Sequence, residues 1–169
     1  SGTYVVNTTP SDLDPLGLSG AEDKMALALD LVNVRLILEP GIAEMAALNA
    51  TEEAILELRC CCERVEERIA SGDMYIQDDI AFHTSVARCS GNKVVEQLIP
   101  IIDTAVMMFV NVTHQRLTKE TVMTHRAIVD AISDRDPIGA KTAMMMHMTY
   151  NRNMILKLIR EEKEKNHKE

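Results

Sequence analysis

The chain has 169 residues, enough for one domain with a sizeable core and too few for two ordinary domains. A hydrophobic content of 46% excludes a disordered acidic tail, and a net charge of −8 makes the chain a poor match for the phosphate backbone of nucleic acids. No apolar run approaches the roughly 20 residues that a membrane-spanning helix needs.

The first 20 residues differ from the rest. Residues 2–6 have the composition of a short strand, and residues 7–20 are rich in Thr, Ser, Pro, Asp and Gly, which is typical of a linker. We therefore interpret residues 1–20 as the end of a preceding domain with its linker, and residues 21–169 as one helical domain.

Helical periodicity begins near Ala21, where apolar residues recur at intervals of 4, 3 and 4: Leu27, Leu31, Val34 and Leu38. Pro40-Gly41 is expected to end this helix, and residues 42–48 predict a second, short one. Thr51 is a predicted N-cap of the next helix, which carries one apolar stripe and ends at Ser71-Gly72.

Helical patterns fill most of the remaining chain, in the segments 74–90, 92–102, 118–132 and 137 to about 160. Asn92 is a predicted N-cap, and Pro100 predicts a kink in the helix that follows it. Asp136-Pro137 combines an N-cap residue with proline at the first helical position, a strong start signal for the last helix. The low aromatic content of 3% and the 11 methionines also favour helices over strands.

One group of residues carries metal-binding chemistry. Asp79 and His83 lie four residues apart on a predicted helix, so their side chains share one face. His125 and His147 fall in two later helices at positions that otherwise face the core. Three imidazoles and a carboxylate suit Zn, Ni, Mn, Co or Fe, as a closed tetrahedron or with two octahedral positions left open. A histidine on an apolar helix face is more often a plain core residue, and the residues alone leave both interpretations open.

Several short motifs resemble those of the C-terminal effector-binding (FCD) domain of FadR-subfamily GntR regulators. They are V-R-x-x-L-E-P at 34–40, D-x-x-F-H at 79–83, S-G-N at 90–92, H-x-x-I-x-x-A-I at 125–132, and D-x-x-x-A at 136–140 with a histidine seven residues on. Residues 2–6 also resemble the last wing strand of the family's winged helix-turn-helix.

This resemblance implies an all-α, antiparallel bundle of six to seven helices around a central metal and ligand cavity. It implies that the family's metal ligands are matched here by Asp79, His83, His125 and His147. Zinc is the first expectation for the divalent ion, with nickel, manganese and iron as alternatives.

The implied effector is a small carboxylate, often bound partly through the metal. Arg35 matches an arginine that reaches into the family's cavity and can pair with a carboxylate, and we expect Met107 and Asn151 to contact the effector as well. Many members carry a second arginine where this chain has Met107 and Met108, which favours an effector with one carboxylate and an apolar part.

We therefore interpret the chain as the ligand-sensing domain, not an enzyme, of a homodimeric bacterial transcription regulator. Such a protein would contact operator DNA only through an N-terminal winged helix-turn-helix and would not bind membranes. Three consecutive cysteines, Cys60 to Cys62, and no visible signal peptide favour the cytoplasm. Two alternatives remain: a helical metalloenzyme, although the chain lacks H-E-x-x-H, and a structural, metal-stabilised dimerisation module.

Overall fold

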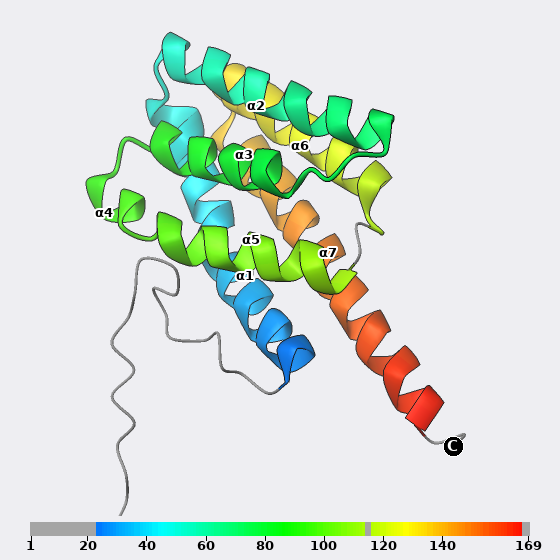
Figure 1. The fold of residues 1–169 in the computed structure, drawn as a ribbon. Coiled ribbons are helices and arrows are strands. Elements are labelled where there is room, and N and C mark those ends of the chain that lie inside the picture. The colour runs from blue at the N-terminus through cyan, green and yellow to red at the C-terminus, as the bar shows by residue number, and fades with distance from the viewer. Residues whose placement is uncertain (1–22, 114–115, 167–169) are drawn as a thin grey trace, which may run out of the picture.

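The computed structural model describes residues 23–113 and 116–166, and these residues form seven α-helices and no strand (Figure 1). The helices are α1 Lys24–Asn49, α2 Glu52–Ser71, α3 Ile76–Cys89, α4 Lys93–Glu96, α5 Ile99–Thr113, α6 Thr118–Ser133 and α7 Pro137–Asn166. The predicted all-α bundle of six to seven helices is confirmed. The interpretation of residues 1–20 as the end of a preceding domain and a linker lies outside the described residues.

The two longest helices, α1 and α7, pack side by side and run antiparallel. Lys141 of α7 is 2.8 Å from Glu44, and Arg152, further along α7, donates to Asn33 at 3.0 Å, earlier along α1. α6 also packs on α7, α2 packs on α3 and α6, and α3 and α5 pack on each other and on α1. In Figure 1, α2 and α6 lie across the top, and α3 and α5 cross in front of α1 and α7.

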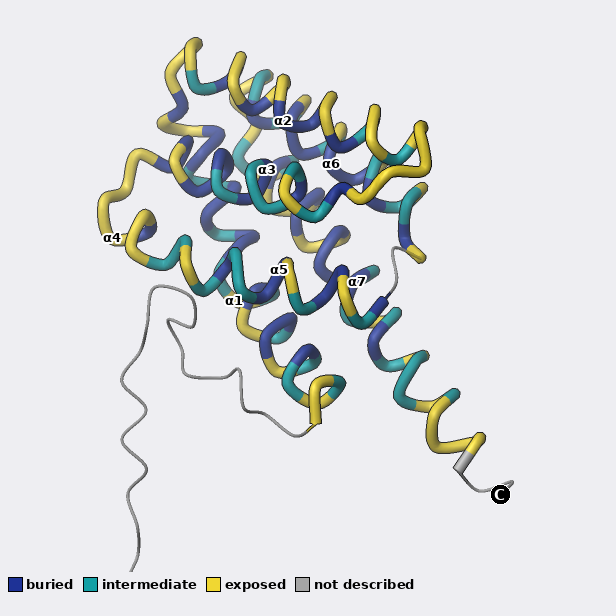
Figure 2. Tube along the Cα trace, in the orientation of Figure 1, coloured by how far each residue is buried: buried dark blue, intermediate teal, exposed yellow. Residues whose placement is uncertain are grey.

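Each long helix turns a buried stripe toward the common core, visible as dark segments in Figure 2. In α2 this stripe contains Ile55, Leu58, Cys62 and Val65, as the sequence predicted. Predicted N-caps are confirmed at Thr51, whose side chain accepts from the amide of Ala54, and at Asn92. Among the described residues, no helix has both the length and the hydropathy needed to cross a bilayer.

The predicted end of a helix at Pro40-Gly41 is wrong, because α1 continues through both residues. Proline cannot donate a hydrogen bond to the carbonyl of Leu36, a loss of about 3 kcal/mol in an ordinary helix. Pro40 is buried in the bundle, and so are Arg35 and Glu39 before it and Ile42 and Ala43 after it. Tertiary packing of both halves therefore holds the helix together across the missing bond.

The predicted kink at Pro100 is also wrong. The segment forms two helices, the short α4 and then α5, with the break at residues 97–98. Pro100 lies in the first turn of α5, where an amide has no helical partner to lose. The last helix begins at Pro137 as predicted but extends to Asn166 rather than to about Arg160. Lys163 and Lys165 in its last turn interact favourably with the helix dipole.

Candidate metal centre

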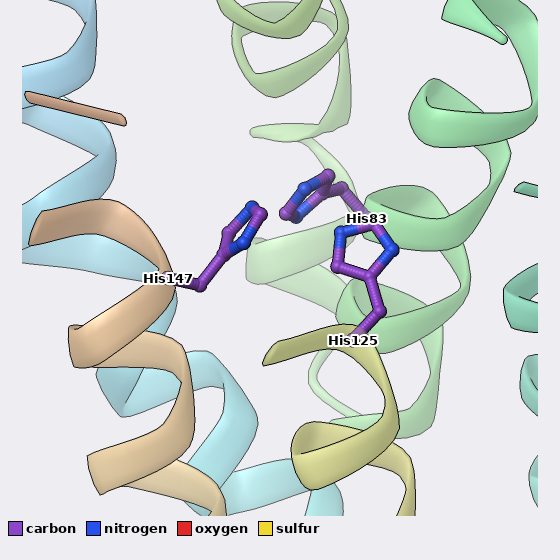
Figure 3. A group of neighbouring side chains, drawn as sticks. All are labelled: His83, His125 and His147. Carbon is purple, nitrogen blue, oxygen red and sulfur yellow. The ribbon is translucent and has the colours of Figure 1, made fainter. Parts of the chain in front are cut away.

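Three imidazoles from three different helices meet in the middle of the bundle (Figure 3). They belong to His83 of α3, His125 of α6 and His147 of α7, and they are 1%, 0% and 2% exposed. One ring nitrogen from each lies within 4.8 Å of the others. The structure therefore brings together three of the four residues that the sequence indicated as metal ligands, from positions far apart in the chain.

The fourth residue, Asp79, borders this group. It lies one turn before His83 on α3, is 4% exposed, and places Oδ1 3.5 Å from Nε2 of His125. Asp79 Oδ1 and both ring nitrogens of His125 have no hydrogen-bond partner within the described residues. Buried polar atoms without partners are rare, since leaving them unsatisfied is costly. A cation between the carboxylate and the imidazoles would bind Asp79 Oδ1 and one ring nitrogen of His125, so these residues fit a divalent metal.

Burial also sets the charge state of the group. It raises the pKa of Asp79, although the neighbouring His83 and Arg35 oppose this effect. Burial lowers the pKa of His125 and His147 well below the usual value, and the neighbouring positive charges act in the same direction. The two imidazoles are therefore neutral at pH 7, which is the form that binds a metal.

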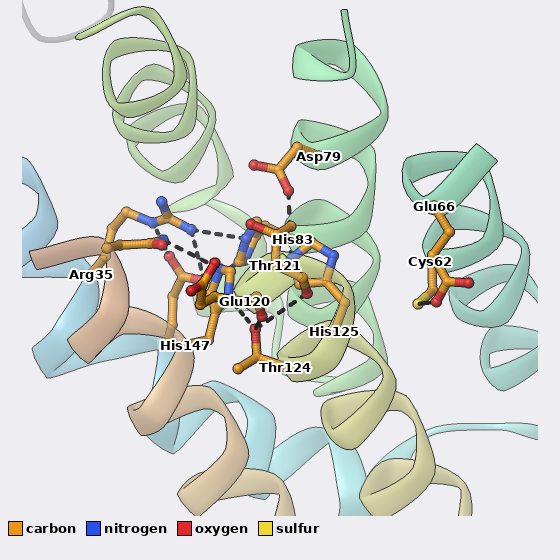
Figure 4. A network of polar contacts seen from close by, with 12 residues as sticks. Arg35, Cys62, Glu66, Asp79, His83, Glu120, Thr121, Thr124, His125 and His147 are labelled. Carbon is orange, nitrogen blue, oxygen red and sulfur yellow. Dashed lines mark hydrogen bonds and ion pairs between the residues drawn. The ribbon is translucent and has the colours of Figure 1, made fainter. Parts of the chain in front are cut away.

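An ion pair on α1 forms a second layer around His83 (Figure 4). Arg35 Nε donates to Glu39 Oε1, and both residues are almost fully buried. Glu39 Oε2 is 2.6 Å from Nδ1 of His83, while Arg35 Nη2 is 3.0 Å from Nε2 of the same ring. Burial alone would raise the pKa of Glu39, but its interactions with Arg35 and His83 bring it well below the usual range. The sequence did not indicate the contact between Glu39 and His83.

His147 has two partners of its own. Thr124 Oγ1 lies 2.7 Å from Nδ1, and Asn151 Nδ2 lies 3.3 Å from Nε2 (Figure 4). Asn151 was expected in this region, and its position four residues after His147 places both on one face of α7. Thr124 was missed. Its only signal in the sequence is its place directly before His125, about 100° around α6, where it faces α7.

The residues expected to contact the effector are placed differently from one another. Arg35 and Asn151 both reach the histidines, whereas Met107 on α5 is 42% exposed. The expected central cavity is not shown among the hollows given for the described residues, since none of these is lined by the histidines. Phe82 stacks on His125 with ring centroids 3.8 Å apart. Three hollows on the described surface lie along α7 and between α2 and α6, away from the histidines.

The chain matches a known domain family and is similar to proteins named as transcription regulators. The FCD domain family profile matches residues 30–150. The chain is similar to the HTH-type transcriptional regulator YcbG of Bacillus subtilis, with 28% identity over 85% of this chain and 63% of YcbG. It is also similar to the HTH-type transcriptional repressor NanR of Citrobacter rodentium, with 29% identity over 68% of this chain and 46% of NanR.

Among solved structures, a GntR protein of Streptococcus agalactiae superposes with a TM-score of 0.74 and 32% sequence identity. The match covers 90% of this chain and 71% of that one. The chain thus spans about half to two thirds of the length of the two curated relatives. These relatives are named as regulators of transcription, which agrees with the expectation of a non-enzymatic domain.

Proposed function

Because the chain belongs to the FCD-domain family of GntR-type transcription regulators, we propose that it binds a divalent metal and senses a small organic acid at that metal. The proposed ligands are Asp79, His83, His125 and His147. Zinc is the first choice for three imidazoles and one carboxylate, with nickel, manganese and iron as alternatives.

The buried atoms without partners support the metal proposal most directly. His125 is fully buried, yet neither of its ring nitrogens has a hydrogen-bond partner among the described residues. The Oδ1 atom of Asp79, 3.5 Å from Nε2 of His125, also lacks a hydrogen-bond partner among the described residues. Asp79 Oδ1 and one ring nitrogen of His125 are therefore neighbouring acceptors without a donor, and a cation bound between them would be their partner.

Arg35 supports the proposed effector. Its Nη1 atom is buried and has no hydrogen-bond partner in the described part of the chain, while its Nη2 atom lies against His83. A bound metal would supply a positively charged position for one carboxylate oxygen, and Arg35 could donate to the other. Asn151, which reaches His147, is a further proposed effector contact.

For the whole regulator, we propose that the acid changes how a homodimer presents an N-terminal winged helix-turn-helix to operator DNA. The net charge of −8 supports a separate DNA-reading part, since this chain alone is too acidic to hold a phosphate backbone. The acid must bind more tightly to one arrangement of the dimer than to another, because only that difference can shift the equilibrium. We place this regulator in the cytoplasm.

The depth of the histidine group favours a second candidate function. All four proposed ligands are at most 4% exposed, as in closed structural metal sites. The metal would then only hold α3, α6 and α7 together within a dimerisation module, and no acid would bind.

Two measurements on the purified 169-residue protein separate these functions. Metal analysis after expression tests the site itself, and about one equivalent of a divalent transition metal is expected. Calorimetric titration of the metal-loaded protein with lactate, succinate, citrate and gluconate then tests sensing. Heat from at least one acid that disappears after metal removal supports the sensor, whereas bound metal with no response to any acid supports the structural role. Protein that takes up no divalent metal contradicts both.

A further inference from the structure

We propose that Thr124 is a positioning residue, which holds His147 in the tautomer that presents Nε2 to the metal. The effect of Thr124 on metal binding rests on the proposed function, whereas the tautomer of His147 follows from hydrogen bonds within the protein. It assigns a role to a side chain that is not itself a ligand.

The Thr124 hydroxyl has three polar neighbours. Oγ1 lies 2.7 Å from the carbonyl oxygen of Glu120, 3.2 Å from that of Thr121 and 2.7 Å from Nδ1 of His147. A hydroxyl has one hydrogen to donate, and a carbonyl oxygen can only accept. Two oxygens 2.7 Å apart need a hydrogen between them, so the hydroxyl hydrogen points to Glu120. Oγ1 must then accept from His147, and Nδ1 carries the proton.

The other side of the ring leads to the same tautomer. Asn151 Nδ2, an amide donor, lies 3.3 Å from Nε2 of His147. A donor in that position requires a lone pair on Nε2. With Nδ1 as the donor and Nε2 as the acceptor, the buried ring carries one proton, and Nε2 is free to bind a metal.

His83 provides an independent parallel. Its Nδ1 atom faces the carboxylate of Glu39, which only accepts, and its Nε2 atom faces the guanidinium of Arg35, which only donates. A lone pair on Nε2 that accepts from Arg35 puts the proton of His83 on Nδ1, on the side of Glu39, which is the same tautomer as that of His147. The contacts at Nδ1 of these two imidazoles resemble the outer contacts of metal-binding histidines. Such contacts orient the ring and keep the ligand nitrogen unprotonated.

The test uses Thr124→Val, which keeps the shape of the side chain and removes the hydroxyl, and Thr124→Ser, which restores it. Zinc affinity is measured by competition with a chelating dye after metal removal. We expect Thr124→Val to bind zinc about 10- to 100-fold more weakly and Thr124→Ser to lie within about threefold of wild type. Thr113→Val is the matched control, since Thr113 is equally buried and makes the same hydroxyl-to-carbonyl bond, to Phe109 on α5. It should lose comparable thermal stability and keep wild-type zinc affinity.

Nitrogen-15 NMR of the metal-free protein reports the tautomer of His147 directly. A purely structural role of Thr124 would leave this tautomer unchanged. The His147 signals, assigned from their loss in His147→Asn, should show a protonated Nδ1 and a bare Nε2 in wild type and a mixture of tautomers in Thr124→Val. A protonated Nε2 in wild type, or unchanged zinc affinity in Thr124→Val, overturns this inference and leaves the metal proposal standing. Wild-type protein that binds no zinc overturns both.

Discussion

Nδ1 of His83 lies 2.6 Å from Oε2 of Glu39, so a carboxylate on α1 orients a proposed metal ligand on α3. Replacing Glu39 by Gln removes the charge that pairs with the buried guanidinium of Arg35. We expect a loss of about 3–5 kcal/mol in the free energy of unfolding, the usual effect of leaving one member of a buried ion pair alone. Zinc affinity should fall as well, by roughly 10- to 100-fold. Urea denaturation and dye competition measure the two effects.

Glu44→Gln is the matched control for this prediction. Glu44 lies on the same helix and pairs with Lys141, but both side chains are well exposed. Exposed ion pairs contribute about 0–1 kcal/mol. Equal losses in the two variants would contradict the distinction drawn between the buried and the exposed pair.

The second prediction concerns Asp79. Asp79→Asn keeps the size of the side chain but replaces the carboxylate whose Oδ1 faces His125. Bound metal, measured by elemental analysis, should fall well below one equivalent. Asp78→Asn is the neighbouring control, since Asp78 pairs with Arg64 and Arg68 at the surface and not with the histidines. Similar metal content in both variants would remove Asp79 from the ligand set.

The third prediction is a loss of stability in acid for the metal-free protein. The pKa of His125 and of His147 is lowered on folding, so below about pH 6.5 the unfolded chain binds protons that the native protein does not. Stability is therefore complete above pH 6.5 and falls as the pH decreases, by about 1 kcal/mol for each histidine between pH 6.5 and 5.5. Asp79, whose pKa is raised by burial, acts in the opposite sense.

Urea denaturation at pH 7.5, 6.5 and 5.5 measures this effect. The variant His125→Asn, which cannot be protonated in this range, should show a shallower loss between pH 6.5 and 5.5. Unchanged stability of the wild-type protein from pH 7.5 to 5.5 would mean that the imidazoles take up protons without unfolding. Zinc added in excess should shift the loss to lower pH, because it binds only the neutral rings.

The fourth prediction concerns the proposed acid site. Arg35→Lys keeps a positive charge but loses the planar fork that can pair with two carboxylate oxygens. For whichever acid of the calorimetric panel binds, affinity should fall by about tenfold or more, with metal content unchanged. Arg152→Lys serves as control, because the Nε atom of Arg152 donates to Asn33 on α1 and not to the histidine group. Equal acid affinity in wild type and Arg35→Lys would place the acid elsewhere.

Local chemistry explains which parts of the fold were predictable. Thr51, Asn92 and the Asp136-Pro137 pair mark helix starts through bonds to their own neighbours, and the structure confirms these starts. Pro40 and Pro100 were misjudged for opposite reasons. At Pro40, tertiary packing outweighs the cost of the missing backbone hydrogen bond. At Pro100 this cost is absent, because α5 begins at Ile99 and the proline lies in its first turn.

The histidine group was predictable only in part. Spacing and resemblance indicated His83, His125 and His147, which do converge. The contacts of Glu39 and Thr124 join residues from different helices, and no local pattern records which helix faces will meet. Met107, which was expected to contact the effector, is 42% exposed, and its contact with an effector stays a prediction.

The proline inside α1 gives this helix an unequal stiffness along its length. Leu36 has no amide donor one turn ahead of it, so the backbone is softest beside Arg35 and Glu39, the two residues that contact His83. A small displacement of either side chain by an ion or an acid would bend the helix there more easily than anywhere else. The segment from Lys24 to Arg35, about 16 Å long at 1.5 Å per residue, carries the buried Ala28, Leu31 and Val32, so a bend at this point would also change its packing in the core.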